Sequence, residues 1–322
     1  MCWRGSVKKK LIMIPYAELE GSNTSTNMLD CNDRVAVYMK NCVVACLSAK
    51  QNAGEDVDVA LVTNNPIGEP YKSLLLEKGV LLINVPFDMF NFAGSYTWCL
   101  AFYKLCAFYH ICREMQYDYY AYLDADVYVQ HPFENVWEEA EKRIMLFDLG
   151  HGLHIPQYQN LAKEMAEFLG EEIYATQYGG EFVAVNKDDA LLLSEKCYEI
   201  YKQMEERAFV TKQGDEFILT IAANGLREKV KSAGAYVFRF HTGTFRIAPA
   251  RYKFNPVSVL HVPNEKKYGF LAIYDYYLRH KQLPANEKVW KALHLTKKSA
   301  KTKREELLSP IKKWIKKLLK KS

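Results

Sequence analysis

The sequence lacks an apolar run of the roughly 20 residues that a membrane-spanning helix requires. The closest candidate, 98–112, is interrupted by Lys104, so we do not expect a transmembrane helix. Three lysines precede the apolar stretch LIMIPYA, as at the start of a signal peptide, but this stretch ends at Glu18 after only about seven residues. We therefore expect a buried first strand there.

Cys-x-x-Cys pairs are also absent, although the chain has eight cysteines. They are Cys2, Cys31, Cys42, Cys46, Cys99, Cys106, Cys112 and Cys197. Four fall at helical spacings within apolar stretches, which is typical of buried thiols in a reducing cytosol. We therefore expect a cytoplasmic protein with neither a zinc site nor a disulfide framework.

A strong overall charge is lacking as well, since the net charge is +5. Residues 297–322 contain eleven Lys or Arg against two Glu, which gives this tail +9 and leaves −4 for the first 296 residues. The basic character therefore belongs to the tail and not to the body of the protein.

Apolar stretches alternate with amphipathic stretches along the 322 residues, enough chain for one large α/β domain or two modest ones. We expect strands at 11–15, 57–63, 80–85, 119–129, 143–147, 177–186 and 257–261, helices at 34–49, 71–78, 95–115, 134–142 and 187–207, and an irregular loop at 148–159. This order favours a largely parallel, Rossmann-like sheet with helices on both faces, in which ligands bind at the carboxyl ends of the strands. The predicted fold class is α/β, with a mixed sheet flanked by helices and an amphipathic C-terminal helix.

The stretch 119–129, YYAYLDADVYV, has the composition of a buried strand that ends in two carboxylates, Asp124 and Asp126. Side chains at i and i+2 of an extended segment point to the same side, so both carboxylates can face one ligand. Two carboxylates held close together repel each other unless a cation lies between them. Oxygen ligands suit Mg²⁺ or Mn²⁺, which keep open positions for the oxygens of a substrate phosphate.

The sequence Tyr122-Leu123-Asp124-Ala125-Asp126-Val127 resembles the Asp-x-Asp motif of GT-A nucleotide-sugar glycosyltransferases. The resemblance implies that the motif holds a metal ion bound to the diphosphate of the sugar donor. It also implies that Lys104, on the helix before this strand, reaches the donor; the alternative is a surface lysine.

Two further motifs resemble the retaining blood-group-type α-glycosyltransferases. Gly179 and Gly180 open the strand at 177–186, either for close approach of a ligand or as a simple bulge. Asp215 and Glu216 open an apolar helical run, where acids also favour the helix dipole. The resemblance implies that Glu216 faces the anomeric carbon and that Asp215 binds donor hydroxyls.

The third metal ligand has two candidates. His261 ends a short strand and is followed by Lys266 and Lys267, an arrangement similar to the metal-binding His and phosphate-binding basic residues of glycosyltransferase family eight. The Lys-Pro-Trp ending of that family is missing here. His241 is the rival ligand, and Tyr16 is a further candidate for donor binding; His151 and His154 are weaker candidates for an acceptor pocket.

The tail has the pattern of an amphipathic helix that follows a Ser-Pro cap. Its apolar positions are Ile311, Trp314, Ile315, Leu318 and Leu319, and six lysines occupy the other face. Such a helix lies in the interface of an anionic membrane, whereas nucleic-acid binding would not require the apolar stripe. The alternative is packing against the body of the protein.

Together these features predict a catalytic domain at 1–265, an extension at 266–296 and a membrane-associating tail at 297–322. We expect a metal-dependent hexosyltransferase at the inner face of a membrane, with UDP as the favoured nucleotide, retention as the favoured outcome and a lipid-linked or surface-polysaccharide acceptor. A sugar-nucleotide pyrophosphorylase is a weaker reading, because that class has a Gly- and Arg-rich loop where this chain has Pro15-Tyr16-Ala17-Glu18. A non-catalytic membrane-associated scaffold is the other alternative.

Overall fold

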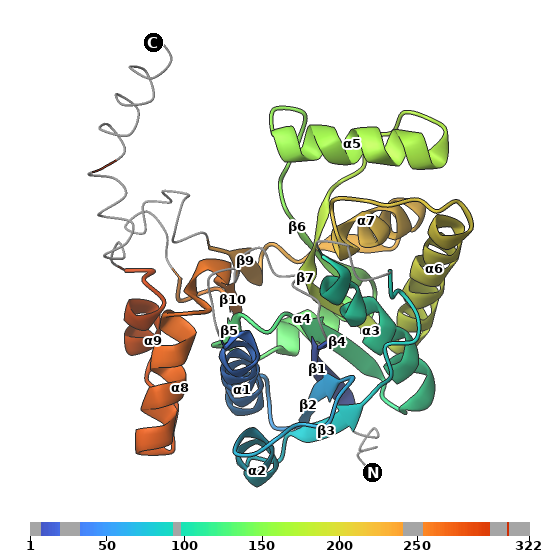
Figure 1. Ribbon diagram of the computed structural model, residues 1–322. Coiled ribbons are helices and arrows are strands. Elements are labelled where there is room, and N and C mark those ends of the chain that lie inside the picture. Colours follow the sequence, from blue (N-terminus) through green and yellow to red (C-terminus); the bar gives the residue numbers. More distant parts are fainter. Residues whose placement is uncertain (1–7, 20–32, 93–97, 241–253, 297–307, 309–322) are drawn as a thin grey trace, which may run out of the picture.

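The computed structural model describes residues 8–19, 33–92, 98–240, 254–296 and 308. Within these ranges the chain forms a seven-stranded sheet, a smaller three-stranded sheet and helices on both faces of the larger sheet (Figure 1). The predicted α/β fold class, a mixed sheet flanked by helices, is confirmed. The predicted tail helix and the rival ligand His241 lie outside the described residues.

The larger sheet has the strand order β3-β2-β1-β4-β7-β6-β8. Its strands are β1 (Lys10–Tyr16), β2 (Val57–Thr63), β3 (Leu81–Asn84), β4 (Tyr119–Leu123), β6 (Ile144–Asp148), β7 (Tyr178–Asn186) and β8 (Val230–Ser232). β7 runs antiparallel to both of its neighbours, and the other strands share one direction. The carboxyl ends of β1 and β4 therefore lie at the same edge as the start of β7.

The larger sheet is buried on both faces, and the side chains of its central strands alternate between two hydrophobic clusters. In β1, Ile12 and Ile14 join one cluster and Leu11 and Met13 join the other. All four side chains are fully buried. An apolar run without polar alternation is what a strand covered on both sides requires.

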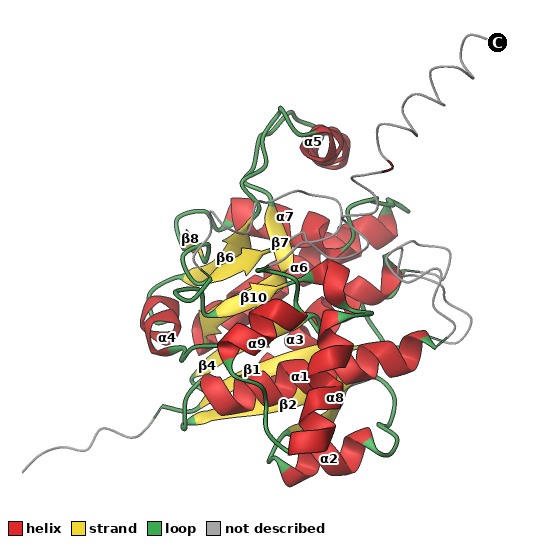
Figure 2. Cartoon of the chain, turned by 90° about the vertical axis from the view of Figure 1, so that its left-hand side faces the viewer, coloured by secondary structure: helices red, strands yellow, loops and turns green. Residues whose placement is uncertain are grey.

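The helices divide between these two faces. One face is covered by α1 (Arg34–Asn52), α2 (Tyr71–Glu77), α4 (Glu134–Ala140), α8 (Gly269–His280) and α9 (Asn286–Ala292). The other is covered by α3 (Tyr103–Glu114), α5 (Pro156–Leu169), α6 (Lys187–Glu206) and α7 (Asp215–Gly225). Figure 2 shows the first face, with α1, α8 and α9 in front of the strands; α5, at the top of the view, contacts α7.

The predicted single strand at 119–129 is wrong in one respect. β4 ends at Leu123, the chain turns, and Val127 begins β5 (Val127–Val129), which belongs to the smaller sheet. That sheet has the order β5-β10-β9, with β9 (Val237–Arg239) parallel and β5 antiparallel to β10 (Val259–His261). The Asp-x-Asp segment is thus a junction between two sheets, because β5 pairs with β10 and not with the neighbours of β4.

Two other expectations need correction. The predicted long helix at 95–115 is a 3₁₀ turn, Cys99–Phe102, followed by α3, and residues 93–97 lie outside the described ranges. The predicted loop at 148–159 contains the start of α5, which Pro156 opens and Gly170 ends in a left-handed conformation. A further 3₁₀ turn, Pro263–Glu265, follows β10. None of the described helices has the length and apolar character needed to span a bilayer.

Candidate functional site

A cleft of about 1220 Å³ lies at the edge of the sheet where β1 and β4 end and β7 begins. Nine of the residues predicted for metal, donor or catalytic roles line it: Tyr16, Lys104, Asp124, Asp126, Gly180, Asp215, Glu216, His261 and Lys266. Gly179 and Lys267 are not among the lining residues. These nine residues come from six segments of the chain, so the cleft is a product of the tertiary fold.

Asp124, Asp126 and His261 form one cluster of possible metal ligands. One ligand atom from each lies within 4.8 Å of the other two. His261 Nε2 is 3.2 Å from Asp126 Oδ2 and 3.7 Å from Asp124 Oδ2. Two carboxylate oxygens and one imidazole nitrogen are a donor set that suits Mn²⁺, and the carboxylates also suit Mg²⁺.

The ring of His261 is oriented by Glu181, a fully buried carboxylate that the sequence did not single out. His261 Nδ1 lies 3.1 Å from Glu181 Oε1. Because an ionised carboxylate can only accept hydrogen bonds, Nδ1 carries a proton and donates it. This directs Nε2 toward the two aspartates, as in metal sites where a carboxylate orients a histidine ligand.

Burial by itself would lower the pKa of His261, but the carboxylates of Asp126 and Glu181 outweigh burial and raise its pKa to about 9. Burial would raise the pKa of Asp126, yet the charges of Lys266 and His261 hold it well below its usual range. Lys266 Nζ pairs directly with Asp126 Oδ2. A metal ion that binds His261 must displace the proton on Nε2, so its affinity rises with pH.

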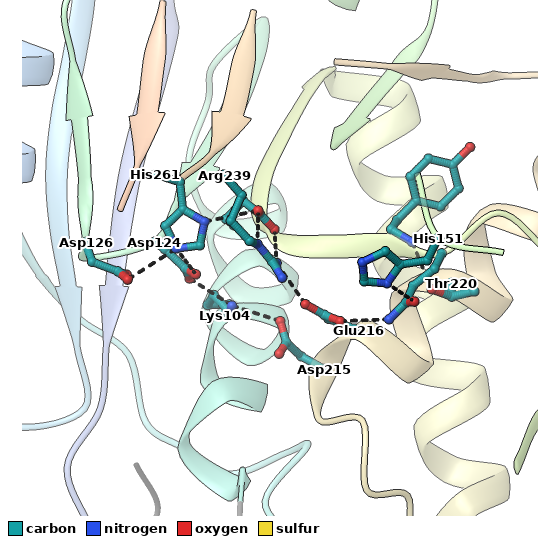
Figure 3. Close-up of polar contacts among 12 residues, drawn as sticks. Lys104, Asp124, Asp126, His151, Asp215, Glu216, Thr220, Arg239 and His261 are labelled. Atoms are coloured by element: carbon teal, nitrogen blue, oxygen red, sulfur yellow. Dashed lines mark hydrogen bonds and ion pairs between the residues drawn. The ribbon is translucent and has the colours of Figure 1, made fainter. Parts of the chain in front are cut away.

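Lys104 separates this cluster from a second pair of acids. Its Nζ lies 2.8 Å from Asp124 Oδ1 and 2.9 Å from Asp215 Oδ2 (Figure 3). Burial would lower the pKa of Lys104, but the two aspartates raise it well above its usual value. The two carboxylates already neutralise part of the charge of Lys104. An anionic substrate group near Lys104 would therefore have to share this positive charge with them.

Asp215 and Glu216 are the first two residues of α7, which points its N-terminus into the cleft. Burial raises the pKa of Asp215 to about 6, although Lys104 opposes this change. Among the described residues, the buried Oδ2 atom of Asp215 has an ion pair with Lys104 but no hydrogen bond of good geometry. An acceptor in that state is suited to a donor group such as a sugar hydroxyl.

Glu216 has partners for both of its oxygens. Arg239 Nη2 donates to Oε1 at 2.9 Å, and Gln177 Nε2 donates to Oε2 at 3.1 Å (Figure 3). Gln177 is held in turn by His151, whose Nδ1 lies 2.9 Å from Gln177 Oε1. His151 lines the cleft, and His154 is not among its lining residues.

Arg239 connects the two ends of the site. Its Nε and Nη2 atoms contact the two oxygens of Glu181 at 2.7 and 2.6 Å, and Nη2 also contacts Glu216. Burial would lower the pKa of Arg239, but the carboxylates of Glu181 and Glu216 raise it above its usual value. Burial would raise the pKa of Glu181, but Arg239 and His261 hold it below its usual range. One guanidinium therefore compensates both carboxylates.

The paired glycines are required by these side chains. A Cβ at Gly179 would overlap the carboxylate of Glu181, and one at Gly180 would overlap the carboxylate of Asp215. The register between β6 and β7 also shifts beside them. The protein's own acids thus approach both glycines closely, and a bulge lies beside them, while the close approach of a ligand stays a prediction.

Sequence reasoning missed Glu181, Arg239 and Gln177. Glu181 directly follows the glycine pair, and a carboxylate inside an apolar strand was a signal that could have found it. Arg239 ends a three-residue strand and carries no such local signal.

No model of a known protein family matches the chain, and no curated protein matches it significantly. Solved structures similar to it include mouse xyloside xylosyltransferase 1 in its apo form. The identity is 13% and the TM-score 0.48, and the match covers 80% of this chain and 98% of that chain. A likeness of this degree does not indicate what this chain does.

Proposed function

We propose that this protein is a metal-dependent glycosyltransferase that moves a hexosyl unit from a nucleotide sugar, with UDP as the favoured nucleotide. The observation that carries the proposal is the donor set of Asp124, Asp126 and His261 within 4.8 Å, next to a second acidic pair in the same cleft. A bound Mn²⁺ or Mg²⁺ would supply positive charge where the leaving diphosphate becomes more negative. Asp124, Asp126 and His261 would hold it.

The protein's own cations would share that task. Lys104 and Lys266 both line the cleft and both pair with aspartates of the Asp-x-Asp segment. Both lysines are buried, and ammonium groups fixed in this way stabilise developing negative charge without having to reorganise. We therefore assign them to the diphosphate; Lys267, which does not line the cleft, is left with a lesser role.

Glu216 would act on the sugar. Glycosyl transfer passes through a sugar with oxocarbenium character, which a nearby carboxylate stabilises. Because Arg239 and Gln177 each hold one oxygen of Glu216, we favour electrostatic stabilisation over formation of a covalent intermediate. Transfer with retention is the favoured outcome, and Asp215 would bind donor hydroxyls.

The test is a panel of nucleotide sugars incubated with the full chain and Mn²⁺. We expect hydrolysis of one donor in the absence of an acceptor, dependent on the metal, and NMR of the released sugar gives the anomer. Calorimetry with UDP, with and without Mn²⁺, provides a second readout. A chain that neither hydrolyses any donor nor binds UDP with Mn²⁺ is instead the non-catalytic scaffold.

We further propose that residues 1–265 are the catalytic domain and that residues 266–296 extend it. The tail, residues 297–322, would associate with an anionic membrane. This location suits an enzyme that acts on a lipid-linked or surface-polysaccharide acceptor. The support is the sequence pattern of residues 311–319 and six lysines, each contributing about 1 kcal/mol near an anionic leaflet. Deletion after Arg304 should abolish sedimentation with vesicles that contain phosphatidylserine and leave hydrolysis intact. Unchanged sedimentation would contradict the anchor; vesicles of phosphatidylcholine alone are the control.

A further inference from the structure

Asp88, Cys106 and His110 form a second cluster of possible metal ligands that does not line the cleft. Cys106 and His110 are four residues apart on α3, and Asp88 follows β3. One ligand atom from each lies within 4.8 Å of the other two. We propose that this cluster is a Zn²⁺ site in which the metal ion links the segment after β3 to α3.

The distances are close to those of a tetrahedral site. His110 Nε2 is 2.9 Å and Cys106 Sγ is 3.8 Å from Asp88 Oδ1. Zinc bonds of about 2.0–2.3 Å place neighbouring ligand atoms roughly 3.3–3.6 Å apart, so each of these two distances needs a shift of only a few tenths of an ångström. Three protein ligands leave one position for water, as in many zinc sites.

The ring of His110 is already oriented for such a role. Its Nδ1 lies 3.0 Å from Glu114 Oε1, one helical turn further along α3. Because both carboxylates can only accept hydrogen bonds, Nδ1 donates to Glu114 and Nε2 donates to Asp88 when no metal is bound. A carboxylate that holds the distal nitrogen is the usual support of a metal-bound histidine.

Asp88 is held in place by the residues around it. Tyr103 Oη donates to Val85 O at 2.9 Å, and the ring of Phe87 packs edge-on against Tyr103. Phe90 is fully buried, and its ring lies 4.8 Å from that of Tyr201. The backbone on both sides of Asp88 is thus anchored, which lowers the entropy lost on binding.

The ligand types indicate which metal. Asp124, Asp126 and His261 offer oxygen and nitrogen, whereas the second cluster offers a sulfur, and a thiolate selects zinc over Mg²⁺ or Mn²⁺. Binding of Zn²⁺ releases the thiol proton of Cys106, which is now directed at Pro86 O at 3.3 Å. It also displaces the proton on His110 Nε2. A zinc site was not expected from the sequence, because Cys-x-x-Cys pairs are absent and Cys106 lies in an apolar helical stretch typical of buried thiols.

The test uses Co²⁺ as a probe on the full chain. Cobalt bound to a thiolate gives a sulfur-to-metal charge-transfer band, which the sulfur-free cleft site cannot produce. We expect a band at one equivalent of Co²⁺ that added Zn²⁺ removes. The band should be lost in Cys106→Ser and His110→Asn, and kept in Asp126→Ala and in Cys112→Ser, the matched control on the same helix.

Glu114→Gln should keep the band but weaken Co²⁺ binding about 10- to 100-fold, because Glu114 only orients the histidine. His110→Asn and Glu114→Gln change partly exposed residues, so they remain informative if Cys106→Ser fails to fold. No band in the unmodified protein, or a band that persists in folded Cys106→Ser or in His110→Asn, would overturn the proposal. Neither result depends on whether the cleft transfers sugars.

Discussion

The two acidic pairs of the cleft, Asp124 with Asp126 and Asp215 with Glu216, compensate their charges in different ways. Lys266 and His261 hold the pKa of Asp126 far below its usual range even though burial opposes them. Asp215 shares Lys104 with Asp124, and burial raises its pKa to about 6. Asp126 is thus arranged to stay ionised, as a metal ligand would need to be, whereas burial raises the pKa of Asp215 toward neutral pH.

The largest effect is expected at the first pair. Asp126→Ala removes a proposed metal ligand and leaves Lys266 and His261 without their shared partner. Metal-held charge stabilisation amounts to several kcal/mol, so donor hydrolysis should fall by roughly 1000-fold or more. Calorimetry with Mn²⁺ should show no binding at this site. Asp188→Asn, an exposed acid on α6, is the control, and normal activity in Asp126→Ala would refute the assignment.

At the second pair, Glu216→Gln should lower kcat by about 100-fold or more, because the amide cannot neutralise positive charge on the sugar. Mn²⁺ affinity should stay within about twofold, since Glu216 does not belong to the metal cluster. Steady-state kinetics and Mn²⁺ calorimetry measure the two quantities separately. Glu228→Gln, an exposed acid, should change neither; a parallel loss of Mn²⁺ binding in Glu216→Gln would show that the two pairs act as one unit.

Glu181→Gln tests the link between the pairs. The amide oxygen can still accept from His261 Nδ1, but it no longer makes the ring more basic. Mn²⁺ affinity should fall by about 10-fold, and activity should recover in part at saturating Mn²⁺. Recovery distinguishes a positioning residue from a metal ligand. Activity that stays low at every Mn²⁺ concentration would instead place the defect at Arg239 and Glu216.

The last expected effect is on stability and not on activity. A folded-state pKa of about 6 for Asp215, against 3.8, means that the folded protein binds this proton more tightly than the unfolded chain. The stabilisation is present below pH 4 and is lost as pH rises through about 6, which costs up to about 3 kcal/mol at neutral pH. Asp215→Asn should therefore raise Tm at pH 7.5 and have little effect at pH 4. Equal shifts at the two pH values would contradict this account.

Local patterns were sufficient for much of the fold and part of the site. The β2 strand and the α1 and α6 helices were predicted almost to their ends, because their apolar spacing, turn residues and caps are local. The predicted strand 119–129 was wrong because its apolar residues suit any buried strand, and only the position of β10 decides that Val127–Val129 joins another sheet.

The sequence by itself determined the alternation of strands and helices, the acids that follow β4 and begin α7, and the basic amphipathic pattern of the tail. Each of these depends on neighbours a few residues apart. Only the tertiary structure decided that His261, 135 positions from Asp126, meets it, and that Arg239 joins Glu181 to Glu216. The physical reason is that a buried charge requires a partner, but nothing in its local sequence specifies which distant residue the fold will supply.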